Sequence, residues 1–346
     1  MITMSEQNGC CSTLQPGQAV HHKDNSPTIT TINIIINCFL VNIAVIIGSF
    51  GNIITIFILS RSKVKDTSSI LLISMAVWDL LFLVNLFVCK LDCIIFRYDP
   101  VLAQMYYPYI FGYVRRPGRM AAFISFTHVV VISFERLLAV FYPFQVSHWI
   151  TEATILTILT CVYFFWIVSF LPYTVANYEI EWALTNNYTL MLPALRETQW
   201  FVQNKPIFTV ISEIINGVIG SLSAVVAANC CAITYQLHYA LRHRSSITSK
   251  SSAGNRREVK ISRMLLVVCV VFSFCNLPGF SIYIYFFADP DMKPPNQLFV
   301  LLNNVEELML AVNAAANFFV YILLSEKFYK SVVSLFVCQR FATSIK

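Results

Sequence analysis

Seven long apolar runs divide this 346-residue sequence, and they constrain its fold more than any other feature. Each run holds about 20 or more mainly apolar residues, enough for an α-helix to cross about 30 Å of hydrocarbon. The third run is the weakest, because three arginines, a proline and a glycine interrupt it at 115–119. The runs cover residues 32–59, 70–96, 104–141, 153–175, 208–241, 259–288 and 298–324. This pattern predicts an all-α fold, a seven-helix transmembrane bundle in one domain.

Composition and charge agree with a membrane protein and orient it. Charged residues make up 12% of the chain, about half the share in a soluble domain, and the mean hydropathy is +0.66. With the N-terminus outside, 14 of the 24 lysines and arginines fall on the inner loops and tail, where positive charge is retained. An inner face that meets anionic lipid therefore explains the net charge of +6 without a nucleic-acid partner.

The chain divides into three parts. Residues 1–31 are expected to be an extracellular tail without the features of a cleaved signal peptide, so the first span is expected to act as its own signal. Residues 32–325 form the helical domain, and 326–346 form an amphipathic eighth helix with a short cytoplasmic tail. Asn187 lies in a glycosylation sequon of the long outer loop. Cys338 is either a palmitoylation site or a plain thiol.

A charged pair, Glu135-Arg136, closes the third run at its cytoplasmic end. A charge in lipid-spanning sequence costs roughly 2.5 to 3.5 kcal/mol, so it persists where it faces protein or water and usually has a function. Other runs carry polar or kinking residues in a fixed order, namely Gly51-Asn52, Asp79 after Met75-Ala76, Cys275-Asn276-Leu277-Pro278 and Asn317 with Tyr321. With Pro143 after the third run, this order resembles the rhodopsin-like (class A) G-protein-coupled receptors from about residue 32 to 338.

The resemblance implies a plasma-membrane receptor that binds an extracellular ligand and activates a heterotrimeric G protein at its inner face. It implies a resting latch between Arg136 and Glu258, although Glu258 could instead only offset its basic neighbours. The residues it assigns to coupling and switching are Glu135, Arg136, Glu258, Tyr321, Tyr235 and Pro143. Those it assigns to a switch inside the sixth helix are Phe272, Cys275, Asn276 and Pro278.

Asp79 needs a partner, because a lone carboxylate in mid-bilayer either takes up a proton or binds a cation. In the resembling family this carboxylate and three polar groups hold an allosteric sodium ion. The four matching residues here are Asp79, Ser125, Asn313 and Asn317. The alternative is a protonated, hydrogen-bonded Asp79, and no other cofactor is expected.

Several family features are absent. Asn276 replaces the usual tryptophan and Phe318 the usual proline, while Phe111 stands where the family carries a disulfide cysteine. The outer loop of 176–207 has no cysteine, so it is expected to lack a disulfide to the third helix and to be mobile. Any outer bridge would most readily join Cys93 to Cys10 or Cys11. These departures resemble divergent molluscan neuropeptide-receptor-like or chemosensory receptors.

The outer helix ends should hold the ligand, since helical bundles bind ligands between facing helices. Mixed charge there suits a peptide, unless the arginines only reach toward headgroups and the acids face water. The charged candidates are Lys90, Asp92, Arg115, Arg119, Glu213, Glu306 and Glu307. The resemblance disfavours an amine ligand, which needs an acid at Gly118, and a light sensor, which needs a lysine at Ala311.

The sequence gives weaker support to functions other than that of a peptide receptor. A small waterborne chemosensory ligand would use the same cavity, and it is the main alternative to a neuropeptide. A transporter would show an internal repeat with matching broken helices, and none is visible. No metal or nucleophile motif of an enzyme is present, and His128 is expected to be a satisfied core residue. The sequence therefore predicts a receptor and not an enzyme.

Overall fold

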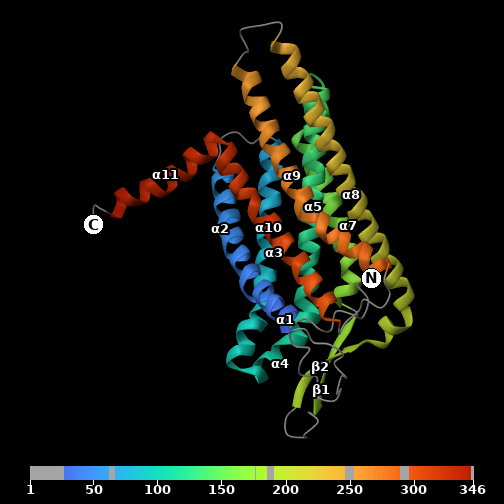
Figure 1. Ribbon diagram of the computed structural model, residues 1–346. Coiled ribbons are helices and arrows are strands. Elements are labelled where there is room, and N and C mark those ends of the chain that lie inside the picture. Colours follow the sequence, from blue (N-terminus) through green and yellow to red (C-terminus); the bar gives the residue numbers. More distant parts are fainter. Residues whose placement is uncertain are drawn as a thin grey trace.

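The computed structural model describes residues 27–61, 67–175, 177–184, 191–245, 253–288 and 296–343. Seven helical stretches within these residues are long and apolar enough to span a membrane, as predicted, and they stand side by side in one bundle (Figure 1). Their bounds are Pro27–Ser60, Thr67–Tyr98, Pro100–Phe141, Glu152–Pro172, Gln199–Gln236, Leu266–Phe286 and Gln297–Leu324. Large apolar side chains such as Phe50, Phe164 and Leu323 remain more than half exposed, as a lipid-facing surface requires.

The spans are built from the following helices. The first comprises α1 (Pro27–Ile34), the π-helical η2 (Ile35–Leu40) and α2 (Val41–Ser60); the second is α3 (Thr67–Tyr98). The third comprises α4 (Pro100–Tyr109), the π-helical η3 (Ile110–Val114) and α5 (Arg115–Phe141). After the short α6 (Val146–Trp149) come α7 (Glu152–Val175), α8 (Gln199–Ser245), α9 (Ala253–Ala288), α10 (Gln297–Leu324) and α11 (Glu326–Thr343).

The third span begins four residues earlier than the apolar pattern predicts. Asp99 caps α4 by accepting hydrogen bonds from the backbone nitrogens of Val101 and Leu102, each at 3.0 Å, and Pro100 occupies the first helical turn. A tyrosine then ties α4 back to α3, since Tyr106 Oη donates to the Val88 carbonyl at 2.7 Å. Polar capping therefore extends the helix beyond the residues that apolarity marks.

A β-hairpin lies at the outer end of the bundle, and the sequence analysis did not anticipate it. Strands β1 (Tyr178–Leu184) and β2 (Met191–Glu197) pair antiparallel, with Tyr178 opposite Glu197 and Leu184 opposite Met191. Figure 1 shows the hairpin projecting beside α4. The predicted outer loop is therefore largely ordered structure, and α8 begins at Gln199 instead of residue 208.

A disulfide joins the first two spans at their outer ends, where Cys38 on η2 pairs with Cys93 on α3 across a Cα–Cα distance of 5.7 Å. The sequence analysis favoured Cys10 or Cys11 as the partner of Cys93, and that assignment was wrong. Cys10 and Cys11 lie outside the described residues.

At the inner end, α11 leaves the bundle as an arm (Figure 1), as predicted for an amphipathic eighth helix. Its Phe328 packs edge-on against Phe318 and Tyr321 of α10, with ring centroids 6.2 and 5.8 Å apart. Phe318 also fills the space beside Gly51 on α2, where a Cβ atom would lie 2.7 Å from the Phe318 Cβ. The phenylalanine that replaces the family proline is therefore a packing residue that requires a glycine opposite it.

Candidate functional site

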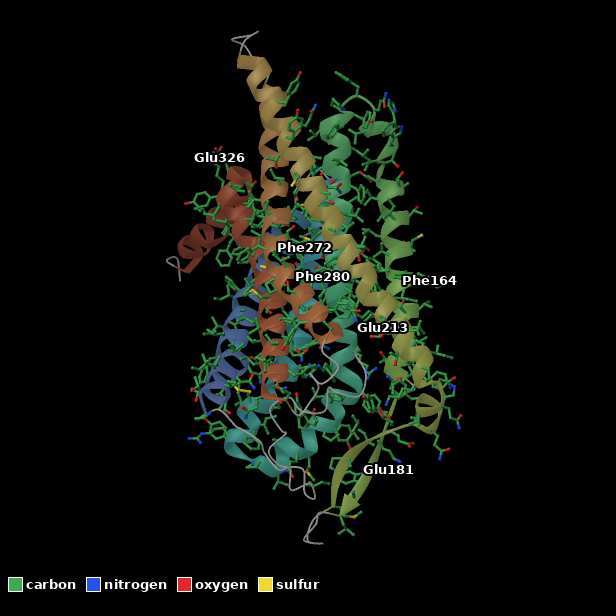
Figure 2. The ribbon with its side chains drawn as sticks, turned by 45° about the vertical axis from the view of Figure 1, so that its right-hand side comes forward. Phe164, Glu181, Glu213, Phe272, Phe280 and Glu326 are labelled. Atoms are coloured by element: carbon green, nitrogen blue, oxygen red, sulfur yellow. A yellow bond between two sulfur atoms is a disulfide. The ribbon has the colours of Figure 1, made fainter. Side chains whose placement is uncertain are left out.

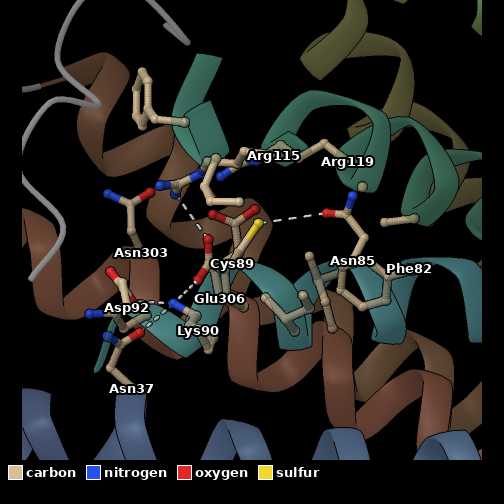
Figure 3. Close-up of a pocket in the computed structure, with 18 of the residues that line it drawn as sticks. Asn37, Phe82, Asn85, Cys89, Lys90, Asp92, Arg115, Arg119, Asn303 and Glu306 are labelled. Carbon is tan, nitrogen blue, oxygen red and sulfur yellow. Dashed lines mark hydrogen bonds and ion pairs between the residues drawn. The ribbon is translucent and has the colours of Figure 1, made fainter. Parts of the chain in front are cut away.

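A cavity opens between the outer ends of α3, η3, α5 and α10 and encloses about 1110 Å³, part of it open to solvent (Figure 3). It brings together six of the seven charged residues that the sequence predicts for the ligand site, Lys90, Asp92, Arg115, Arg119, Glu306 and Glu307. Glu213 lies on α8 (Figure 2) and is not among the residues that line this cavity or the deeper one below, so its place in the site stays a prediction.

Glu307 is the centre of the charged cluster in this cavity. Its carboxylate oxygens lie 2.5 Å from Lys90 Nζ and 2.9 Å from Arg115 Nη2, so it joins α10 to α3 and α5. The Glu307 side chain is only 11% exposed and is stabilised there by these two cations. We predicted that Glu307 contacts the ligand directly. In the structure its carboxylate forms ion pairs with Lys90 and Arg115 of the protein itself.

Three asparagines complete the cluster, and the sequence analysis missed them. Lys90 Nζ donates to Asn37 and, at 3.3 Å, to Asn304 Oδ1. Asn304 in turn donates to Asn33 Oδ1 at 2.5 Å. The π-helical turn η2 places Asn37 in the protein interior, where it is 3% exposed. A buried polar residue in an apolar run is the signal that could have identified Asn37.

Gly118 occupies the position where an amine receptor would carry an acid, and here its lack of a side chain is a packing requirement. A Cβ atom at this position would overlap Asn85 Oδ1 and lie 2.5 Å from its Cγ. Asn85 is held in place because its Nδ2 donates at 2.8 Å to the Val114 carbonyl at the end of η3. The asparagine from α3 therefore fills the space beside Gly118.

A second, deeper cavity of about 830 Å³ lies below the first. The two share lining residues, among them Arg119, Phe123 and Glu306, so Arg119 and Glu306 lie at their junction. Aromatic rings such as Phe126, Phe280 and Tyr283 share the deeper walls with polar side chains such as Asn216 and Asn276. A ligand group that passes the charged junction therefore meets both aromatic and polar surfaces.

The predicted helix-switch residues cluster at the wall of this deeper cavity. Phe272 on α9 stacks on Phe126 of α5 with ring centroids 4.7 Å apart, and Asn276 Nδ2 donates to the Phe272 carbonyl at 2.8 Å. Cys275 and Asn276 line the cavity, and Pro278 lies inside α9. Figure 2 shows Phe272 and Phe280 along α9. The residues predicted to act as a switch within α9 thus lie at or next to the cavity.

The predicted sodium residues meet in the middle of the bundle. Asp79 is 2% exposed and accepts hydrogen bonds from Ser125 Oγ and, at 2.9 Å, from Asn317 Nδ2. Asn313 lines the deeper cavity together with Asp79 and Ser125. Asp79 is thus hydrogen-bonded by Ser125 and Asn317, and Asn313 lies on the wall of the same cavity as Asp79. Carboxylate, hydroxyl and amide oxygens of this kind are ligands that hard cations such as Na⁺ prefer.

At the inner end, Arg136 is held by neighbours on α5 and α3. Its Nη2 lies 2.9 Å from Glu135 Oε1 and also donates to Ser68. Ser68 and Thr67 donate to the same Glu135 oxygen at 2.9 and 3.3 Å. The start of α3 is therefore part of this inner cluster, which the sequence analysis did not foresee.

The other predicted coupling residues are more scattered. Tyr321 is buried, whereas Tyr235 on α8 is 72% exposed, and Pro143 is exposed just beyond α5. The side chain of Glu258, like that of Cys338, lies outside the described part of the structure, and so does Asn187. Among the predicted coupling residues whose side chains the structure describes, Glu135 and Arg136 contact each other directly.

Two sequence comparisons agree with this geometry. The model of the family described as 7 transmembrane receptor (rhodopsin family) matches residues 51–321. This chain belongs to that family. It is 24% identical over 315 residues to the FMRFamide receptor of Drosophila melanogaster, and the match covers 87% of this chain but 54% of that receptor.

Two vertebrate proteins are also similar to this chain. It is 25% identical to somatostatin receptor type 5 of Bos taurus, over 82% of this chain and 72% of that receptor. It is 26% identical to human neuromedin-U receptor 2, over 84% of this chain and 70% of that receptor. The match thus spans about half the length of the Drosophila melanogaster receptor and 72% and 70% of the two vertebrate receptors. All three proteins are named as receptors and not as enzymes or transporters.

Proposed function

We propose that this protein is a plasma-membrane receptor for a neuropeptide, and that it activates a heterotrimeric G protein. The outer cavity carries the proposal, because it presents both signs of charge at its mouth and aromatic and polar walls below. A peptide offers backbone amides, charged ends and aromatic side chains to such a surface. The names of the similar receptors support a peptide, and none of them favours the chemosensory alternative.

Glu306 and Arg119 are the residues that we propose to meet charged groups of the ligand. Both residues line the outer and the deeper cavity, so a ligand that enters either one passes them. A basic ligand group would approach Glu306, and an acidic or carbonyl group would approach Arg119. Each charge-assisted contact would contribute about 1.5 to 3 kcal/mol.

The inner cluster is the site that we propose for G-protein activation. Arg136, held by Glu135 and Ser68, would be released when α9 moves, and its guanidinium would then contact the G protein. Glu258 is proposed as a further partner of Arg136 in the resting state. Asp79, Ser125, Asn313 and Asn317 are proposed to hold a sodium ion that favours this state.

The direct test is expression in cells that report calcium and cyclic AMP, with a panel of amidated neuropeptides followed by amino acids and small waterborne odorants. We expect a response to at least one peptide that weakens as the peptide is shortened, and that is lost in Arg136→Ala at matched surface expression. A response to a small ligand that ignores peptide length would favour the chemosensory function instead. A ligand response that Arg136→Ala retains in full would refute the inner site.

A further inference from the structure

The outer hairpin is attached to the third span although the position of the family disulfide is a phenylalanine. That residue, Phe111 on η3, is 3% exposed and packs edge-on against Tyr178 at the base of β1, with ring centroids 5.8 Å apart. Tyr178 is itself 9% exposed, and its ring also packs against Phe201 at the start of α8. The contact therefore lies inside the protein and not on a mobile surface loop.

Arg115 and Arg116 are consecutive in the sequence but contact different parts of the protein. Arg115 points into the ligand cavity and pairs with Glu307, whereas Arg116 points to the hairpin. The Arg116 guanidinium lies 5.0 Å from the centre of the Tyr178 ring, and the Asn177 side-chain oxygen accepts from both of its terminal nitrogens, at 2.5 and 3.3 Å.

Phe111 and Arg115 also line the ligand cavity. The Arg115 guanidinium lies 5.7 Å from the centre of the Phe111 ring on the way to Glu307. A chain of contacts therefore runs from Tyr178 in the hairpin through Phe111 and Arg115 to α10. The position of the hairpin and the shape of the cavity wall depend on the same side chains.

We propose that Phe111, Arg116, Tyr178 and Asn177 form an aromatic clamp that replaces the missing disulfide and holds the outer hairpin against the third span. In this proposal Phe111 and Arg116 are positioning residues, because they act by holding the hairpin and not by binding the ligand. The clamp has no sulfur, so the attachment of the hairpin should not depend on redox conditions. The inference concerns the receptor without ligand and stands independently of which ligand binds.

The test is hydrogen–deuterium exchange of the full-length receptor in lipid nanodiscs without ligand. Arg116→Gln and Phe111→Ala should each speed exchange of the β1 and β2 amides roughly tenfold, the ratio that the loss of about 1.4 kcal/mol gives. Tyr178→Phe keeps the ring and should leave the exchange unchanged. Arg97→Gln removes an exposed arginine from the outer end of α3 and is the matched control.

A designed disulfide separates the clamp from general destabilisation. A Cβ atom at Gly112 would lie 3.9 Å from the Tyr178 Cβ, within the range that a disulfide needs, and only the flexible end of Leu195 approaches it closely. In a receptor with Gly112→Cys and Tyr178→Cys, protection of the hairpin should equal that of the wild type and should be lost when a reducing agent is added. In a Cys38→Ser, Cys93→Ser receptor without the designed pair, the same reducing agent should not change protection of the hairpin.

Three results would overturn the proposal. The first is hairpin exchange in Arg116→Gln and Phe111→Ala within twofold of the wild type. The second is an equal acceleration throughout α3, which would mean general unfolding and not release of the hairpin. The third is loss of hairpin protection on reduction of a Cys38→Ser, Cys93→Ser receptor, which lacks the bridge between the first two spans, since that loss would assign the attachment to another disulfide.

Discussion

The packing of Asn85 against Gly118 allows a quantitative prediction about the stability of the receptor. Gly118→Ala places a methyl group where Asn85 Oδ1 lies, and it would leave only 2.5 Å to the Asn85 Cγ. Either the helices separate, or Asn85 turns away and gives up its hydrogen bond to the Val114 carbonyl. Overpacking and a lost buried hydrogen bond each cost about 1 to 3 kcal/mol, so we expect Gly118→Ala to destabilise the receptor by roughly 2 to 4 kcal/mol.

A double-mutant cycle distinguishes this cause from the general effect of a helix substitution. Asn85→Ala removes the obstructing amide and should cost about 1 to 3 kcal/mol by itself, because the Val114 carbonyl then lacks this donor. Adding Gly118→Ala to Asn85→Ala should cost little more, because the methyl group now has room. The two substitutions should therefore be strongly non-additive.

Thermal unfolding in nanodiscs provides the assay, followed with a fluorescent maleimide that reacts as buried thiols become accessible. The receptor supplies its own reporters, the buried cysteines Cys230, Cys269 and Cys275. Gly217→Ala is the matched control, since a Cβ atom there meets nothing within 4 Å and should be neutral or slightly stabilising. The reasoning is refuted if Gly118→Ala melts like Gly217→Ala, or if the Asn85 and Gly118 effects add.

Three further predictions concern the other clusters. Cys38→Ser should lower the melting temperature as much as Cys93→Ser, with no added loss in the double variant, and non-reducing peptide mapping should find the two cysteines joined. Agonist affinity should fall as sodium rises in the wild type but not in Asp79→Asn, and an unchanged sodium response in the variant would exclude the site. Glu258→Ala should raise basal signalling about fivefold at matched surface expression, the effect of losing roughly 1 kcal/mol; equal basal activity would rule out the latch.

The bundle was predictable because its signal lies along single helices. Length and apolarity alone mark the seven spans, and the order of the polar residues indicates their relative positions. Asp79, Ser125 and Asn317 could be grouped from their place on their own helices, and the structure brings all three into contact.

Features that depend on partners distant in the chain could not be predicted in this way. The Cys38–Cys93 bridge requires the π-helical turn η2, and no apolar pattern marks such a turn. The hairpin was not predicted because its strands are defined by pairing with each other, and the apolar runs that mark the spans carry no information on pairing within 176–207. Glu307 and Glu306 are adjacent in the sequence, and only the positions of Lys90 and Arg115 show that the first of them is already paired.

The proposed role of Glu306 is the central claim about the ligand site, and one measurement tests it most directly. Once a peptide agonist is found, its potency should be compared on the wild type, Glu306→Gln and Glu213→Gln at matched surface expression. Glu213 is the matched control because it is an acid on α8 that is not among the residues lining either cavity. We predict a loss of about tenfold or more for Glu306→Gln and a change within twofold for Glu213→Gln. Equal potency on all three receptors, or a larger loss for Glu213→Gln, would contradict the account.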